Sequence, residues 1–166
     1  IPCFVSQPDR VDGEPVTRFV LGAFQAVQSG YQTESLLELL KTGVSGFSTE
    51  EISALENYAY LWRLTGQDWR REFVRHPRGF GQEMTQEDSQ ELERLNGLRQ
   101  RLMEPLERFA ARTSHATGAQ LSQGVYLLLT AFGLEETLPA YCQSLEEAGE
   151  PGLAQRQLRV WDLLMQ

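Results

Sequence analysis

The sequence predicts an all-α fold, a single-domain bundle of about seven helices. Apolar residues recur at steps of three and four along most of the chain, which is the spacing of one helix face. An alternating strand pattern survives only between Cys3 and Ser6. A length of 166 residues with 41% hydrophobic residues suits one packed core. We therefore expect residues 1–166 to form one helical domain.

Three helices are predicted in the first part of the chain. Proline suits the first turn of a helix, and glycine often ends one. A serine followed three residues later by a glutamate forms a capping box, in which each side chain satisfies a free backbone N–H group. These signals predict helices from Pro15 to Gly30, between Thr33 and Gly43, and from Ser48 to about Leu64.

Four more helices are predicted after residue 84. The first begins after Thr85, and Pro105 inside it should kink or split it, because proline lacks an N–H group and clashes with the preceding turn. The second follows a capping box of Thr117 and Gln120, and its apolar sequence favours a central position. The last two are expected after Gly133 and after Pro151-Gly152.

A long arginine-rich loop, residues 66–84, separates the two groups of helices, with room for one helical turn around Trp69 to Phe73. Residues 61–81 carry a net charge of +3, against −5 for residues 1–60 and −6 for residues 82–166. Arginines interleaved with aromatic residues can hold phosphates and stack on bases. They can also pack a loop across acidic helices, which we favour because arginine stems and tryptophans commonly cover neighbouring helices. The candidate nucleic-acid-binding residues are Lys41, Arg63, Trp69, Arg70, Arg71 and Arg75.

Charge and cysteine content exclude several classes of protein. A net charge of −8, from 15 basic and 23 acidic residues, disfavours nonspecific wrapping of nucleic acid. Cys3 and Cys142 lie far apart without Cys/His clustering, so neither a zinc site nor a disulfide framework is predicted. No apolar run approaches the roughly 20 residues that span a bilayer. We expect a protein of the reducing cytoplasm without membrane contact.

No catalytic or metal-binding combination is evident. His76 and His115 each lack a second histidine four residues away, so we expect them to be solvated or to cap a helix. Lys41-Thr42-Gly43 lacks the preceding glycines of a phosphate loop and the Ser-x-x-Lys partner of a penicillin-recognising site. Lys41 is better explained by the carbonyl end of a helix, where a cation is favoured.

Two short segments carry a resemblance. Residues 39–48 are LLKTGVSGFS and residues 55–58 are LENY, with Glu51 between them. In this order and spacing they resemble a stretch of the AddB-type subunit of bacterial AddAB ATP-dependent helicase/nucleases. Thr65-Gly66 with Trp69, and the helix from Leu98 to Leu106, are similar to later segments of the same family. Ile1-Pro2-Cys3-Phe4 resembles the strand at which superfamily 1 helicases lead into an inserted helical accessory domain called 2B.

The resemblance implies a 2B-like helical accessory domain without catalytic groups of its own, cut from a longer chain; the start at Ile1-Pro2 fits such a piece. The parent would be the AddB-type subunit of an ATP-dependent helicase and exonuclease that processes double-strand breaks for homologous recombination repair. Its implied partners are the AddA-type subunit of that complex, and double-stranded DNA. ATP, magnesium and an iron-sulfur cluster are implied for the parent complex, and no cofactor for this part.

Two other functions remain open on the sequence. A stand-alone acidic helical module would bind a partner helix in its apolar grooves, and a reading frame from near Ile1 to near Gln166 would support it. A small hydrolase or metal enzyme would lose activity on mutation of His76 or His115.

Overall fold

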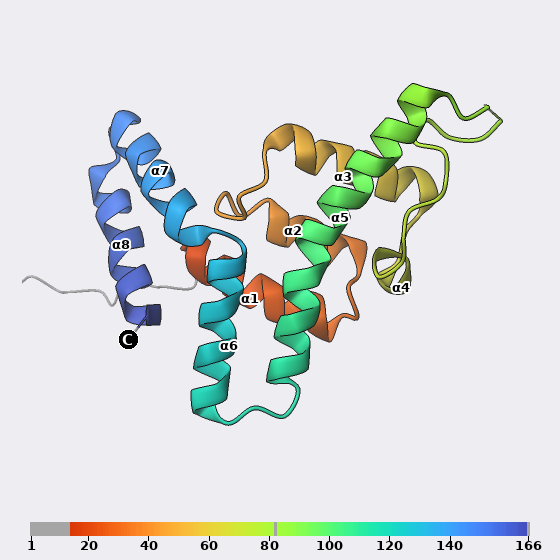
Figure 1. Cartoon of the computed structure of the whole chain (residues 1–166). Helices are drawn as coiled ribbons and strands as arrows, with labels where there is room; N and C mark the ends of the chain where they lie inside the picture. The colour runs from red at the N-terminus through yellow and green to blue at the C-terminus, as the bar shows by residue number, and fades with distance from the viewer. Residues whose placement is uncertain (1–13, 82, 166) are drawn as a thin grey trace, which may run out of the picture.

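The computed structural model describes residues 14–81 and 83–165, and every regular element in them is a helix (Figure 1). The all-α class predicted from the sequence is confirmed. Ile1-Pro2-Cys3-Phe4 and the strand expected between Cys3 and Ser6 lie outside the described residues. The eight helices are α1 (Pro15–Gln28), α2 (Thr33–Leu40), α3 (Thr49–Trp62), α4 (Gly66–Trp69), α5 (Gln86–Thr113), α6 (Gly118–Ala131), α7 (Leu134–Glu147) and α8 (Pro151–Met165).

Seven of these helices are those that the sequence predicts, and the predicted capping boxes form. At the start of α3, the Ser48 hydroxyl accepts the N–H of Glu51, and the Glu51 carboxylate accepts the N–H of Ser48. At the start of α6, the Gln120 side-chain oxygen accepts the N–H of Thr117 at 2.9 Å and the Thr117 hydroxyl at 3.1 Å. The eighth helix, α4, is one turn inside the predicted loop and ends at Trp69, the residue at which the sequence predicts a turn to begin.

Two details of the second half differ from the prediction. Helix α5 runs through Pro105 as one helix of 28 residues, so the split at this proline does not occur. Leu102 and Leu106, on either side of the proline, are fully buried, and this packing offsets the hydrogen bond that proline cannot donate. Helix α6 is peripheral rather than central: Leu121 and Tyr126 are 38% and 45% exposed. It lies between α5 and α7 and leaves a face in solvent.

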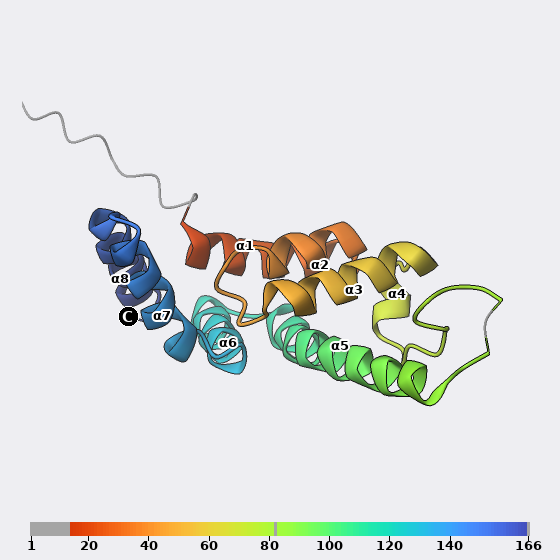
Figure 2. The ribbon, with the colours of Figure 1, turned by 90° about the horizontal axis from the view of Figure 1, so that it is seen from above.

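The molecule is elongated (Figure 2). The α7–α8 hairpin lies at one end, and α4 with the chain that follows it lies at the other. The start of α1 belongs to the α8 end, because the Glu14 carboxylate accepts a hydrogen bond from the Gln157 amide and lies 3.4 Å from the Arg156 guanidinium. Between the two ends, apolar side chains of α1, α2, α3 and α5 form the core, with Phe19, Leu36, Leu55 and Phe109 almost wholly buried.

Candidate functional site

The positive segment predicted from the sequence is a strap of irregular chain at the end of the molecule opposite α8 (Figure 2). We call the described residues between α4 and α5, 70–81 and 83–85, the arginine loop. It crosses from the end of α3 to the start of α5 and is tied to both helices. The contacts below decide which of its side chains are free to meet a ligand.

Helix α4 fixes the start of the loop through Trp69. The indole N–H donates to the Thr33 hydroxyl at 2.9 Å, and that hydroxyl donates to the Leu64 carbonyl at 2.5 Å. A Cβ on Gly66 would lie 1.9 Å from the Gly30 carbonyl oxygen, so only glycine permits this approach of α4 to the turn after α1. The Trp69 ring is fully buried, so it has no face free for a base.

The next anchor is a side-chain amide that pairs with the loop backbone. Asn96 of α5 accepts the Phe73 N–H and donates to the Phe73 carbonyl, both at 2.8 Å. Arg99 donates to Asn96 Oδ1 at 3.2 Å and to the Trp69 carbonyl at 3.3 Å. Burial lowers the pKa of the Arg99 guanidinium. These buried polar groups satisfy one another, as packed interiors require.

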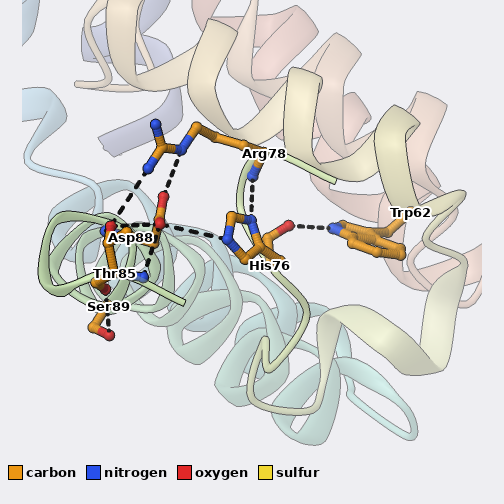
Figure 3. Close-up of polar contacts among 6 residues, drawn as sticks. All are labelled: Trp62, His76, Arg78, Thr85, Asp88 and Ser89. Carbon is orange, nitrogen blue, oxygen red and sulfur yellow. Dashed lines mark hydrogen bonds and ion pairs between the residues drawn. The ribbon is translucent and has the colours of Figure 1, made fainter. Parts of the chain in front are cut away.

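Helix α3 holds the middle of the loop through Tyr58. Its hydroxyl donates to the Arg75 carbonyl at 3.0 Å and accepts the Arg75 N–H at 3.1 Å. The Tyr58 ring stacks on Phe73 with the centroids 4.6 Å apart. One residue further along the loop, the His76 carbonyl accepts the indole N–H of Trp62 at 3.0 Å (Figure 3). The backbone of residues 73–76 is therefore fixed on two sides.

The end of the loop is fastened to the start of α5 by Asp88 (Figure 3). Arg78 Nε donates to Asp88 Oδ1 at 2.6 Å, and the Thr85 hydroxyl donates to Asp88 Oδ2 at 2.5 Å. Hydrogen bonds from Arg78, and then from Thr85, hold the pKa of this carboxyl well below its usual range. Asp88 thus caps α5 and binds the loop arginine at the same time.

His76 lies beside Arg78 and Asp88, and the prediction that its side chain is solvated is wrong. Its side chain is 9% exposed, and Nδ1 accepts the Arg78 N–H at 3.1 Å, which leaves the ring proton on Nε2, 3.4 Å from Asp88 Oδ2. Ser89 lies nearby in Figure 3, but its hydroxyl donates to the Thr85 carbonyl at 3.0 Å. The three residues therefore do not form a Ser-His-Asp relay. His115 is exposed, as expected.

The structure separates the six candidate residues. Trp69 is in the core, Lys41 pairs with Glu56 at 2.6 Å, and Arg70 pairs with Glu107 at 2.7 Å. Arg63 and Arg71 are exposed, and neither forms an ion pair within residues 14–81 and 83–165. The Arg75 guanidinium lies over the Trp62 ring, 5.3 Å from its centroid, and donates to the Trp62 carbonyl at 3.0 Å.

Two of these arginines line an open hollow at the end of α3. We call this surface the tip hollow; its volume is about 600 Å³, and it is lined by Leu61, Trp62, Arg63, Arg75 and Phe80. Phe80 is 83% exposed, and its ring meets that of Trp62 edge to face, with the centroids 4.4 Å apart.

Phe80 is one of the aromatic residues that the sequence interleaves with the arginines, together with Trp62, Trp69 and Phe73, but it is not among the six candidate residues. The available signal is its position between two glycines, because Gly79 and Gly81 have φ angles of +105° and +79° that favour glycine. The same stretch of sequence gives no indication that Trp62 lies beside that side chain.

Neither a metal-binding cluster nor a membrane-spanning helix is present in the described part of the chain. No group of three or more His, Cys, Asp and Glu side chains in it could hold a metal ion. An iron-sulfur cluster with four cysteine ligands does not fit a sequence that has two, and Cys142 is buried, with burial raising the pKa of its thiol. Among the described helices, none is both long and apolar enough to cross a membrane.

Comparison with known proteins gives one consistent result. No family model matches the chain. The AddB-type subunit of the ATP-dependent helicase/deoxyribonuclease of Ruminiclostridium cellulolyticum is 29% identical over 171 residues, which cover 99% of this chain and 15% of that protein. The corresponding proteins of Caldanaerobacter subterraneus and Clostridium novyi are 26% and 25% identical, over 99% and 100% of this chain and 14% of each protein. The predicted AddB-type resemblance is confirmed. The chain spans about 15% of the length of these relatives.

The two segments that carry the AddB-type resemblance contact each other. Lys41 of the first pairs with Glu56 of the second, and Leu55 of the second is fully buried. In the first segment, the hydroxyls of Thr42 and Ser45 donate to the Leu39 and Leu40 carbonyls at 2.9 and 2.7 Å and so satisfy the end of α2. Tyr58 of the second segment binds the arginine loop. The side chains of both segments therefore hold helices and the loop together.

Proposed function

We propose that the chain is a non-catalytic helical accessory segment of an AddB-type helicase/nuclease protein. The observation that carries the proposal is the match of 99% of this chain to 15% of the AddB-type protein of an ATP-dependent helicase/deoxyribonuclease. A match of this extent is what a segment within a larger protein produces. The parent protein would process double-strand breaks in the cytoplasm for homologous recombination repair, together with its AddA-type partner.

An accessory role is supported by how the polar side chains of the arginine loop are used. A catalytic group must reach its substrate. His76 is nearly buried, and its ring nitrogens face Arg78 and Asp88. Arg70 and Arg78 are both paired with carboxylates of α5. Most polar side chains of this loop therefore hold the loop in position. The side chains that remain exposed are suited to bind a partner rather than to catalyse a reaction.

The proposal assigns the chemistry of the parent complex to other segments. ATP and magnesium would be bound by motor segments, and the iron-sulfur cluster by a segment with enough cysteines. This segment would contribute a rigid helical body and a surface toward DNA. Its net charge of −8 limits that surface to the few places where arginines are free.

Two measurements test the proposal. The coding sequence on both sides of the chain should contain helicase motifs upstream and a cysteine-bearing nuclease segment downstream. The purified 166-residue chain should neither hydrolyse ATP nor cleave DNA, whereas the intact protein with its AddA-type partner should degrade duplex ends when ATP is present. Turnover by the chain alone, or a reading frame from near Ile1 to near Gln166, would overturn the proposal.

A further inference from the structure

The tip hollow differs in charge from the rest of the molecule. Its lining consists of two arginines, two aromatic rings and a leucine, without a carboxylate, in a chain of net charge −8. Arg70 and Arg78 lie in the same loop but are neutralised by Glu107 and Asp88. Arg71 is also exposed but does not line the hollow, so Arg63 and Arg75 are the cations available beside the exposed Phe80 ring.

We propose that the tip hollow binds single-stranded DNA, with an unpaired base stacked on Phe80 and the neighbouring phosphates held by Arg63 and Arg75. The choice of DNA as the nucleic acid rests on the proposed function. The assignment of the site rests on the exposure of Phe80, the two guanidinium groups and the absence of carboxylates from the lining of the hollow.

The Phe80 ring has the properties of a stacking platform. It is 83% exposed, so most of its apolar surface faces water in the free protein. The Trp62 indole touches it edge to face at 4.4 Å and limits its movement. Trp62 is fixed in turn, because its indole N–H is bound to the His76 carbonyl (Figure 3). A ring that is held on one side and open on the other can accept a base without a large loss of side-chain freedom.

The two arginines that line the hollow with that ring come from separate parts of the chain. Arg75 is oriented by its hydrogen bond to the Trp62 carbonyl and by its contact with the Trp62 ring. Tyr58 holds both backbone groups of the same residue. Arg63 ends α3 in a left-handed conformation with φ of +49°, and its side chain is exposed. Phosphates on either side of a stacked base can meet such cations.

The geometry favours a single strand over a duplex. In a duplex the base faces are covered by their neighbours, so an exposed ring stacks only if it separates a base step, which costs a few kcal/mol. In a single strand the faces are open, and stacking on an aromatic ring tolerates any sequence. An acidic peptide would satisfy the arginines but would give Phe80 no planar partner.

The test measures fluorescence anisotropy of a fluorescein-labelled oligo(dT) of about 15 nucleotides, a length within the site sizes of single-strand binding folds, with the full chain across a range of salt concentrations. A blunt duplex of the same length and a glutamate-rich peptide are the competing ligands. We expect the single strand to bind more tightly than either competitor.

Phe80→Ala should weaken this binding about tenfold, because it removes one stacking contact. Phe80→Trp should retain it. The matched control Tyr126→Ala removes a ring that is 45% exposed on α6 and should leave the affinity unchanged.

The contribution of the arginines is measured by the salt dependence of the affinity. Arg63→Gln should lower the slope of log affinity against log salt concentration by about 0.7, the value for one phosphate contact of a single strand. Arg112→Gln removes an exposed arginine at the end of α5 and should leave the slope unchanged. The site is refuted if Phe80→Ala and Tyr126→Ala bind oligo(dT) equally, if the duplex or the peptide binds as well as the single strand, or if oligo(dT) does not bind at low salt. None of these results affects the proposed function, which is tested by the catalytic activities of the intact protein.

Discussion

Among the described glycines, Gly66 leaves the least space for a side chain. A Cβ there would lie 1.9 Å from the Gly30 carbonyl oxygen, a backbone atom that cannot move aside cheaply. We predict that Gly66→Ala lowers the free energy of unfolding by about 1–3 kcal/mol, as overpacking of a well-filled interior does.

Urea unfolding followed by circular dichroism would measure this change. Gly97→Ala is the matched control, because no atom lies within 4 Å of its added Cβ, and the exposed interior of α5 should gain about 0.5–1 kcal/mol from alanine. Equal effects of the two substitutions would contradict the close approach.

Asn96 is the second residue on which the loop depends. Its amide bonds both backbone groups of Phe73 at 2.8 Å in a buried position. Asn96→Ala leaves a buried N–H and a buried carbonyl without partners, so we predict a loss of about 2–4 kcal/mol in the free energy of unfolding.

Chemical denaturation would measure that loss, and Asn57→Ala, an exposed asparagine on α3, should change stability by less than about 0.5 kcal/mol. A small effect at both positions would mean that Asn96 does not hold the loop.

Asp88 makes stability depend on acid pH. Its pKa is lowered in the folded state, chiefly by the hydrogen bond from Arg78. A depressed pKa adds stability that is complete above the pKa of the unfolded chain, about 3.9, and is lost as the pH falls through and below that value. We predict that Asp88→Asn is less stable than the wild type at neutral pH and that this difference shrinks below about pH 4.

Thermal unfolding of both proteins between about pH 2 and pH 7 would measure the two curves. A difference in stability that stayed constant over that range would show that the charge of Asp88 contributes nothing.

Among the larger elements, the arginine loop acts as a strap between α3 and α5. Tyr58→Phe keeps the stacked ring but removes two hydrogen bonds to Arg75. We predict that amide exchange at Arg75 becomes about tenfold faster or more, because local opening of the loop costs less free energy.

Hydrogen-exchange mass spectrometry of residues 73–80 would detect the change. Tyr60→Phe, on the 55% exposed Tyr60 of the same helix, is the control and should leave exchange unaltered. Loops that open equally in both variants would show that the Tyr58 hydroxyl does not hold the strap.

The helices can be predicted from the sequence because the signals that specify them are local. Capping boxes and glycine stops act within one or two turns, so the helix starts at Ser48 and Thr117 are predicted correctly. The continuity of α5 through Pro105 and the exposed position of α6 depend on which elements lie alongside them. That packing is set by contacts distant in sequence, which periodicity does not report.

Over the full length of the molecule, the same limit applies to the candidate site. The sequence identifies a positive segment but cannot tell that Arg70 meets Glu107, 37 residues later, whereas Arg63 remains exposed. The sequence also does not predict the contact between the Phe80 and Trp62 rings. Among the six candidates, the structure leaves Arg63, Arg71 and Arg75 as exposed cations without a carboxylate partner in the described residues. Among the aromatic residues interleaved with the arginines, it distinguishes Phe80 by its exposure.

The elongated shape places the tip hollow and helix α8 at opposite ends of the described chain (Figure 2). The tip hollow lies far from α8, and the start of α1 is tied to α8 through Glu14 and Gln157 (Figure 2). Residues 14 and 157 are therefore close in space. Under the proposed function, a flexible linker can therefore replace the segment in the parent protein.

Under the proposed function, this segment assists a larger DNA-processing protein and performs no chemistry itself. The most direct test replaces residues 14–165 in the intact protein with a short Gly-Ser linker and compares the two forms, each with its AddA-type partner. We predict that the shortened complex still cleaves single-stranded DNA but degrades duplex ends with ATP far more slowly. Loss of single-strand cleavage by a folded complex, or unchanged degradation of duplex ends, would contradict the proposal.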